Sequence, residues 1–415
     1  MGEIEQRLAE IEHAGLSRRL RLVSGAQGPR VLLDGDPVLL LCSNNYLGLA
    51  DHPQVREAAA RVALEVGAGA GASRLVSGTM TIHAELEQRL AAFEGSEACV
   101  LFGSGYLANL GTIGALAGPG DTIFSDALNH ASIVDGCRAS RAEIVVYRHL
   151  DCEHLEHCLQ SDAARGSAGH VGHERRRLIV TDSVFSMDGD VAPLARVVKL
   201  ARRYDARLIV DEAHATGALG AGGRGAVAAA GLQDEVDVLV GTLGKALGSY
   251  GAYVCASEQM VRYLVNTARP LIFSTAPAPP SVAAALAALD LLEGKPELVE
   301  RLHEAARALR AGLAHQGFAV QLSDMHIVPL LIGDCADALR VCEAAIQRGV
   351  FAQAIRPPTV PAGTSRLRLA VMASHAPAEL RDAAKTLVDA VRTAGLDPTT
   401  IGEQAAGVPP LAGVS

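Results

Sequence analysis

The chain has 415 residues, of which 49% are hydrophobic and 20% charged, and its formal net charge at pH 7 is -9. This length suffices for one large and one smaller domain with buried cores, and the composition excludes a disordered chain. The acidic balance argues against nucleic acid or a membrane as the main partner, because both call for a basic surface. Small-molecule chemistry is therefore expected.

The beginning of the chain predicts an amphipathic helix and not a secretion signal. The stretch MGEIEQRLAEIEHAGLSRRLRL carries acidic residues among its apolar positions and has no continuous apolar segment. No other stretch is long and apolar enough to cross a bilayer. Eight cysteines without a CxxC pair suit a reducing compartment. We expect a cytoplasmic protein.

Four regions follow from the order of apolar and polar segments. Residues 1–45 predict a helix and a hairpin that turns at residues 34–37. Residues 46–285 predict a large α/β domain, and the Pro-rich STAPAPPSV lies near its end. A smaller α+β domain is expected at residues 286–395, and a flexible tail at residues 396–415.

Short apolar strands alternate with helical segments in the large region. The predicted strands read ACVLF, TIFSD, EIVVY, RRLIVTDSV, ARLIVDEAH and VDVLVGT. This alternation is typical of a parallel sheet with helices on both faces. Residues 161–177 interrupt it and predict a surface excursion.

Polar residues follow five of these strands. In chain order they are Gly103, Ser104, Gly105, Tyr106, Asn129, His130, Ser186, Met187, Asp188, Asp211, Glu212, His214 and Lys245. Ligands of open parallel sheets gather at the carboxyl ends of the strands. These residues are therefore expected to surround one site.

The combination suits pyridoxal 5'-phosphate. Lys245 offers an amine for a Schiff base, and Asp211, at the end of an apolar strand, offers a carboxylate for the pyridinium nitrogen. His130 supplies a flat imidazole, and Gly105 opens a helix whose free N–H groups suit a phosphate. Taken alone, each of these signals more often marks a helix cap or a turn, and the prediction depends on their order along alternating strands.

Three other interpretations were weighed. The glycine-rich segments at residues 67–73 and 217–225 do not follow a strand and open a helix, as a dinucleotide-binding fingerprint requires, so an NAD-dependent oxidoreductase is not favoured. A binding protein without catalysis would lack the lysine or the acid, and both are present. The cluster of Cys152, His154, His157 and Cys158 does not have a usual zinc spacing and predicts a partly exposed helix without metal.

Five motifs carry a resemblance to a known family. They read SRLVSGTMTIHAELEQRLAAFEG, TDSVFSMDGDVAPL, LIVDEAHATGALG, GTLGKALGSYGAYV and IRPPTVPAGTSRLRLAVMASH. From about Asn44 to His375 the chain resembles the α-oxoamine synthases, and most closely the members that form 8-amino-7-oxononanoate in biotin biosynthesis. The resemblance implies the type I aminotransferase fold, with a mostly parallel seven-stranded sheet, and a homodimer with shared active sites.

Residue roles come from this resemblance position by position. Lys245 resembles the lysine that links to the cofactor and removes the Cα proton, Asp211 the partner of the ring nitrogen, and His130 the stacked imidazole. Further cofactor contacts implied are Ser104, Gly105, Tyr106, Ser186, His214, Thr242, and, from the partner subunit, Ser274 and Thr275. Substrate contacts implied besides His130 are Arg18, Asn44, Arg356 and Thr359. Ala215 departs from the family, whose members often have glycine there.

The implied reaction condenses L-alanine with a pimeloyl thioester and releases carbon dioxide. The carrier is left open between CoA and acyl carrier protein. Glycine-using relatives, 2-amino-3-oxobutyrate CoA ligase and 5-aminolevulinate synthase, remain alternatives because SGTMTIH also resembles the latter. Arg18, Arg19 and Arg21 are the candidates that could meet a distal carboxylate, and Arg18 is preferred.

Overall fold

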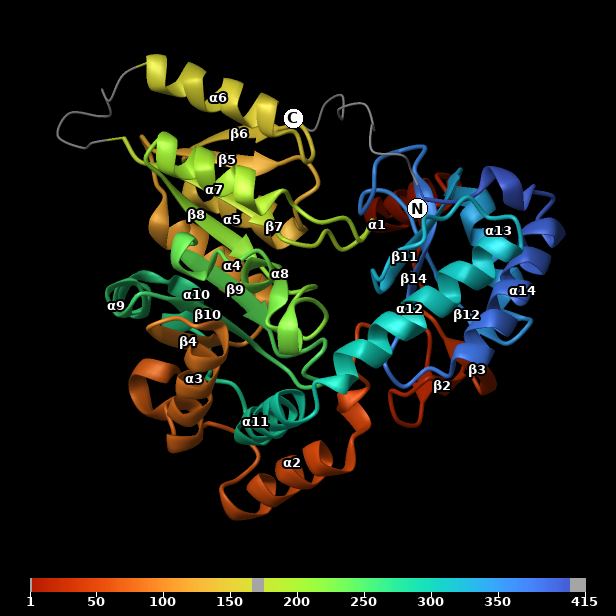
Figure 1. Ribbon diagram of the computed structural model, residues 1–415, viewed down its shortest axis with the longest axis horizontal. Helices are drawn as coiled ribbons and strands as arrows, with labels where there is room; N and C mark the ends of the chain where they lie inside the picture. Colours follow the sequence, from red (N-terminus) through yellow and green to blue (C-terminus); the bar gives the residue numbers. More distant parts are fainter. Residues whose placement is uncertain (1, 166–174, 404–415) are drawn as a thin grey trace. The chain divides into compact units, whose positions relative to one another are not determined.

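The computed structural model describes residues 2–165 and 175–403. Its contacts divide the chain into two units. The large unit comprises residues 49–186 and 190–299, and the small unit comprises residues up to 48, residues 187–189 and residues from 300 onward. Each unit is described by itself below, with the labels of Figure 1.

A seven-stranded sheet forms the centre of the large unit, with the order β4-β10-β9-β8-β7-β5-β6 among the described residues. The strands are β4 (Ala98–Phe102), β5 (Thr122–Asp126), β6 (Glu143–Tyr147), β7 (Arg177–Asp182), β8 (Ala206–Asp211), β9 (Val238–Thr242) and β10 (Ala252–Ala256). Only β10 runs antiparallel to its neighbours in this sheet. The predicted α/β fold with a mostly parallel sheet is confirmed.

Helices cover both faces of this sheet (Figure 1). The helices of this unit are α2 (Pro53–Glu65), α3 (Thr81–Glu94), α4 (Gly105–Leu116), α5 (Ala131–Ser140), α6 (Cys152–Ala164), α7 (Leu194–Arg203), α8 (Gly225–Ala229), α9 (Glu258–Thr267), α10 (Arg269–Ile272) and α11 (Pro279–Gly294), with short helices η1 (Leu49–Asp51), η2 (Arg74–Gly78), η3 (Ala221–Gly223) and η4 (Gln233–Glu235). Ile113 of α4 and Ile133 of α5 share one buried cluster with Ile209 of β8. Leu208 and Val210 must face the other side, because successive strand residues alternate.

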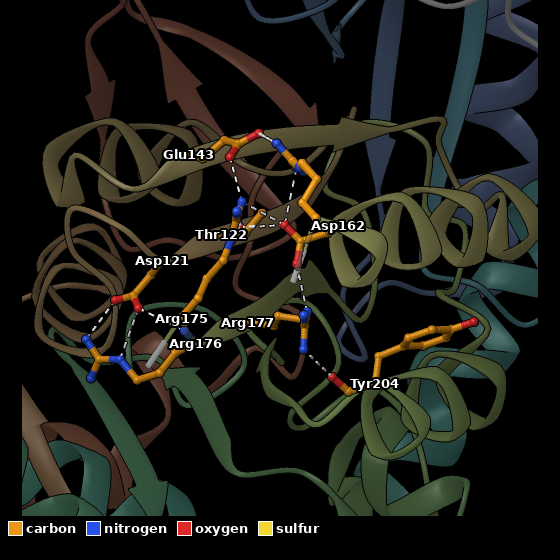
Figure 2. A network of polar contacts seen from close by, with 9 residues as sticks. Asp121, Thr122, Glu143, Asp162, Arg175, Arg176, Arg177 and Tyr204 are labelled. Atoms are coloured by element: carbon orange, nitrogen blue, oxygen red, sulfur yellow. Dashed lines mark hydrogen bonds and ion pairs between the residues drawn. The ribbon is translucent and has the colours of Figure 1, made fainter. Parts of the chain in front are cut away.

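A network of buried charges joins α6 to the amino ends of β5 and β7 (Figure 2). Asp162, which is 0% exposed, accepts from Nε of Arg177 at 2.7 Å and pairs with Nη2 of Arg175 at 2.8 Å. Asp121, just before β5, accepts from Nη2 of Arg176 at 2.7 Å. Since the amino ends lie at the sheet edge opposite the carboxyl ends, this network supports the fold and not the site.

The small unit contains two further sheets. One has the order β1-β2-β3-β12, formed by Val23–Ser24, Arg30–Leu33, Asp36–Leu40 and Val350–Phe351, and the other has the order β11-β14-β13, formed by Ile327–Gly333, Ser365–Ala370 and Gln353–Ile355. Its helices are α1 (Glu3–His13), α13 (Cys335–Ile346), α14 (Pro377–Thr393) and η5 (Pro398–Thr400), while α12 (Glu297–His315) begins in the large unit. β3 pairs in parallel with β12. The N-terminal hairpin thus shares a sheet with residues far along the chain.

This pairing bears on the predicted regions. The hairpin within residues 1–45 was assigned to a region of its own, but it lies in the small unit. Residues 396–403 differ from the predicted tail, because Ile401 is buried and the N–H of Ala319 donates to its carbonyl at 2.9 Å. The four-part division itself stays a prediction, and residues 404–415 lie outside the described residues.

Two other expectations concern exposure and membranes. Of the predicted excursion at residues 161–177, residues 161–164 belong to α6, and residues 166–174 lie outside the described residues. In the described parts of the chain, no helix combines the length and apolar character needed to span a membrane.

Candidate active site

Lys245 lies in the turn that follows β9. Its Nζ is 2.8 Å from Nε2 of His214, which comes from the turn after β8. The chain reverses at Gly248, whose φ is +58°, and a Cβ there would be 2.4 Å from the backbone N of Ala50. Only glycine fits this turn without displacement, because it has no Cβ. The turn thereby holds the half-buried lysine beside the imidazole.

Asp211 ends β8 and is only 4% exposed. Its Oδ2 accepts from Nδ2 of Asn109 at 2.6 Å, and its Oδ1 accepts from the backbone N of Ala213 at 2.8 Å. These two N–H donors satisfy the carboxylate in its buried position. Asp211 is therefore suited to face a cation.

His130 caps the N-terminus of α5. Its backbone N–H donates to Oδ2 of Asp182 at 2.8 Å, and its Nδ1 is 2.7 Å from Oγ of Ser132. The residue is exposed, yet desolvation of the ring lowers the pKa of His130 despite the nearby carboxylate of Asp211. A neutral imidazole is the favoured state.

The N-terminus of α4 forms the predicted phosphate cradle. Ser104 is its N-cap, and Oγ of Ser104 accepts from the N–H of Leu107 at 3.3 Å. A Cβ at Gly105 would meet no atom within 4 Å, so there is space beside the helix end. Tyr106 is exposed and donates a short hydrogen bond to Asp135. Space and free backbone N–H groups at a twelve-residue helix suit an anion.

The remaining predicted cofactor contacts lie at the end of β9, after β7 and after α10. Thr242 ends β9, where its Oγ1 donates to the carbonyl of Gly251 at 3.2 Å. Ser186 is half-buried in the segment after β7. Ser274 and Thr275 follow α10, and Thr275 forms an isolated bridge with Ser73. Their roles toward the cofactor stay predictions.

Apart from His130, the predicted substrate contacts lie in the small unit and fall into two groups. Arg356 is buried and donates to the carbonyls of Gly15 and, at 3.0 Å, Ser17. Nη2 of Arg18 donates to the carbonyl of Pro357 at 3.0 Å. The N–H of Thr359 donates to the carbonyl of Arg356 at 3.1 Å. Residues 15–18 therefore lie against the turn at residues 356–359.

Asn44 belongs to the second group. Its Oδ1 accepts from Nη1 of Arg368 at 3.1 Å and from the hydroxyl of Tyr46 at 3.1 Å. Arg368 is buried, and sequence reasoning did not select it. Its only signal was that it alternates with leucines, as Arg366 does, in the fully buried strand SRLRLA. The structure thus places a second buried guanidinium beside a predicted substrate residue.

The cysteine and histidine cluster has no ligand geometry. Sγ of Cys158 is 3.7 Å from Nε2 of His154, and Cys152 is buried. Within residues 2–165 and 175–403, no group of three or more His, Cys, Asp or Glu is placed to hold a metal ion. These residues form part of α6.

The sequence matches a family model over most of its length. The model described as "Aminotransferase class I and II" covers residues 36–387. The chain belongs to this family. Among curated relatives, the 8-amino-7-oxononanoate synthase of Citrifermentans bemidjiense is 50% identical over 387 residues, which is 92% of this chain and 97% of the relative. That of Geobacter metallireducens is 51% identical over 377 residues, which is 90% of this chain and 94% of the relative.

A solved structure gives the same result for the fold. A structure of SPT with a PLP internal aldimine has a TM-score of 0.86 and 34% identity, and the alignment covers 95% of this chain and 98% of that one. The resemblance to the α-oxoamine synthases and the type I aminotransferase fold are thereby confirmed. The two synthases named above, at 50% and 51% identity, are more similar to this chain in sequence than this SPT structure, at 34%.

The residues of this aminotransferase-family chain fit pyridoxal phosphate. The space at Gly105, the buried carboxylate of Asp211 and the amine of Lys245 all occur in the large unit. Sequence reasoning missed Asn109 and Ser132, which connect Asp211 to His130 by hydrogen bonds. The signal for Asn109 was a single amide in the apolar helix YLANLGTIGALA. Ala215 is absent from the described residues with positive φ, so its methyl group requires no backbone change there.

Proposed function

We propose that this chain is an 8-amino-7-oxononanoate synthase of biotin biosynthesis. It uses pyridoxal 5'-phosphate to condense L-alanine with a pimeloyl thioester of CoA or acyl carrier protein, and releases the free thiol and carbon dioxide. The observation that carries this proposal is the 50% identity over 92% of the chain to a synthase of that name. An acyltransferase is accordingly favoured over an oxidoreductase.

The large unit contributes the groups that handle protons and charge. When bound, pyridoxal phosphate supplies an electron sink for the charge left at Cα. Nζ of Lys245 takes the Cα proton of L-alanine, and His214, 2.8 Å away, orients that amine. The carboxylate of Asp211 would neutralise a protonated ring nitrogen. The backbone N–H groups at Gly105 would hold the phosphate.

Four of the proposed substrate contacts, Arg18, Asn44, Arg356 and Thr359, belong to the small unit. Arg356 is proposed to hold the alanine carboxylate, because a guanidinium gives two parallel hydrogen bonds to it. The two carbonyls that Arg356 now contacts belong to residues 15–17, and these must give way for such a contact. Asn44 and Thr359 are proposed to lie beside the substrates, and Arg18 to meet the distal carboxylate of the pimeloyl group.

A second copy of the chain is proposed to complete each site. In the large unit, residues 72–76 lie beside residues 273–276, because Ser73 bridges Thr275 and the N–H of Ala276 donates to the carbonyl of Ala72. This surface exposes Val76 at 80% and Phe273 at 70%. Exposed apolar patches of this kind mark interfaces. The dimer would bring Ser274 and Thr275 to the partner's cofactor.

Sedimentation tests the dimer. Val76→Asp and Phe273→Asp should shift the purified protein toward monomer, whereas Leu64→Asp, an equally exposed apolar residue of α2, should not. Dimers that persist at micromolar concentration in both patch variants would refute this interface.

We also propose a cytoplasmic location, since all eight cysteines are free thiols.

Product analysis tests the reaction. Purified protein loaded with pyridoxal phosphate should convert L-alanine and pimeloyl-CoA to 8-amino-7-oxononanoate, as detected by mass spectrometry. Glycine with acetyl-CoA or succinyl-CoA, and L-serine with palmitoyl-CoA, are the matched alternatives. Faster turnover of any of these pairs would overturn the assignment.

A further inference from the structure

Asn109 lies between two groups that the proposed chemistry uses. It is 0% exposed on α4. Its Nδ2 donates to Oδ2 of Asp211 at 2.6 Å and to Oγ of Ser132 at 2.9 Å. Ser132 in turn lies 2.7 Å from Nδ1 of His130. A continuous chain of hydrogen bonds between side chains therefore runs from the buried carboxylate of Asp211 to the exposed imidazole of His130.

The direction of each hydrogen bond follows from the acceptor at one end. An ionised carboxylate can only accept, so Asp211 must face the NH₂ group of Asn109 and not its oxygen. The second hydrogen of that NH₂ group goes to Oγ of Ser132, which leaves the hydroxyl hydrogen of Ser132 for Nδ1 of His130. The backbone N–H of Ser132 also points to Nδ1, at 3.2 Å. Nδ1 is therefore an acceptor, and a neutral His130 carries its proton on Nε2.

Close helix packing makes this chain possible. A Cβ at Gly136 of α5 would lie 3.2 Å from the backbone oxygen of Asn109 and 3.0 Å from Cδ1 of Ile113. Because Gly136 has no side chain, α5 can approach α4 closely. Ser132, which lies one turn before Gly136 on α5, can therefore reach Asn109. Asn109 also follows Gly105 by four residues, so one helix presents both the phosphate cradle and the amide on the same face.

We propose that Asn109 and Ser132 are positioning residues that couple the carboxylate of Asp211 to the ring of His130 and fix its Nε2-protonated tautomer. The part that concerns the tautomer needs only the protein. The part that concerns the cofactor rests on the proposed function, because it states that the amide of Asn109 aims the carboxylate of Asp211 at the ring nitrogen. Buried hydrogen-bond networks act as units in this manner.

Two readouts on the full-length holoprotein test the proposal. The first is the tautomer of His130, from long-range ¹H–¹⁵N correlations of protein labelled with ¹⁵N-histidine, assigned with His130→Gln. The second is the protonation of the ring nitrogen, from the ¹⁵N shift of labelled pyridoxal phosphate between pH 6 and 10. Ser132→Ala removes the hydroxyl donor and leaves only the backbone N–H at 3.2 Å, so it should weaken the Nδ1-acceptor signature and raise the share of the other tautomer, while the ring nitrogen stays unchanged. Asn109→Leu should alter both and lower the pKa of the ring nitrogen by about one unit or more.

Thr112→Val is the matched control. Thr112 is likewise buried on α4, and replacing its hydroxyl should leave both readouts unchanged. An unaltered His130 tautomer in Ser132→Ala and Asn109→Leu would overturn the coupling. If Asn109→Leu does not fold, Asn109→Asp and Ser132→Ala decide the same question. If the protein binds no pyridoxal phosphate, the proposed function fails, while the tautomer readout still decides the coupling.

Discussion

The Nζ atom of Lys245 lies 2.8 Å from Nε2 of His214. The two residues follow neighbouring parallel strands, β9 and β8, so the sheet register fixes their approach. The backbone N–H of Gly248 donates to the carbonyl of Lys245 at 3.0 Å, so the turn restricts the backbone that carries this amine. This restriction is what a lysine needs to act repeatedly at one carbon atom.

Replacement of this lysine should abolish both cofactor attachment and turnover. The wild-type protein is expected to be yellow, with absorbance at about 420 nm, and to carry a borohydride-reducible link to the cofactor. Lys245→Ala should lose the link, and Lys199→Ala, an exposed lysine on α7, should keep it. Mass spectrometry after borohydride treatment is the measurement. A reducible link retained in Lys245→Ala would remove Lys245 from this role.

Asp211→Asn should retain cofactor and lose proton transfer. An amide cannot neutralise a cationic ring nitrogen, and the loss of such a charge amounts to about two orders of magnitude or more in rate. Exchange of the alanine α-proton in deuterium oxide, followed by NMR, measures this step without the thioester. Exchange at the wild-type rate would exclude the carboxylate from the mechanism.

Asp162→Ala should destabilise the fold without touching the active site. The change leaves Arg175 and Arg177 without their buried partner, and breaking a buried ion pair reduces the free energy of unfolding by about 3 to 5 kcal/mol (Figure 2). Urea unfolding measures the loss. Glu156 lies on α6 like Asp162, and it forms an exposed ion pair with Arg203 of α7. Glu156→Ala, which breaks this pair, should change the free energy of unfolding by less than about 1 kcal/mol. Equal losses in both variants would contradict the role of burial.

The sequence predicted the parallel sheet and the residues at its carboxyl ends because both depend on local patterns. Apolar runs identified β5, β7, β8 and β9, and the polar residues after them needed no further information. The chain from Asp211 to His130 was not predictable in this manner, since it depends on the approach of α4 to α5 at Gly136. The contact of Arg356 with residues 15–17 joins positions more than 330 residues apart, and no local pattern encodes it.

Glu94 should make stability depend on pH. It is buried, accepts a 2.5 Å hydrogen bond from Tyr253, and burial raises its pKa from 4.5 to about 8. The protonated form is therefore favoured in the folded state. The stabilisation of the fold that this raised pKa provides is complete below pH 4.5 and is lost as the pH rises to about 8. Between these values the free energy of unfolding should fall by up to about 1.4 kcal/mol per pH unit.

Glu94→Gln keeps an acceptor for Tyr253 but cannot ionise. The variant should therefore gain stability relative to wild type between pH 5 and pH 9, as measured by urea unfolding at each pH. Glu85→Gln, an exposed position on the same helix, should follow wild type. A constant difference between Glu94→Gln and wild type at all pH values would mean that Glu94 does not titrate in this range.

Arg18→Ala should selectively weaken use of the pimeloyl thioester. Arg18 is exposed, and its Nη2 already reaches the carbonyl of Pro357 at 3.0 Å, next to Arg356, so its charge lies beside the proposed substrate residues of the small unit. A charge-assisted hydrogen bond to a distal carboxylate contributes about 1.5 to 3 kcal/mol, which corresponds to roughly one to two orders of magnitude in kcat/KM. A thioester of similar length without that carboxylate should lose much less. Arg19→Ala is the control, because Arg19 is also exposed and pairs only loosely with Glu343, at 3.7 Å. Equal losses for both thioesters would show that Arg18 supports the turn at Pro357 and does not read the substrate.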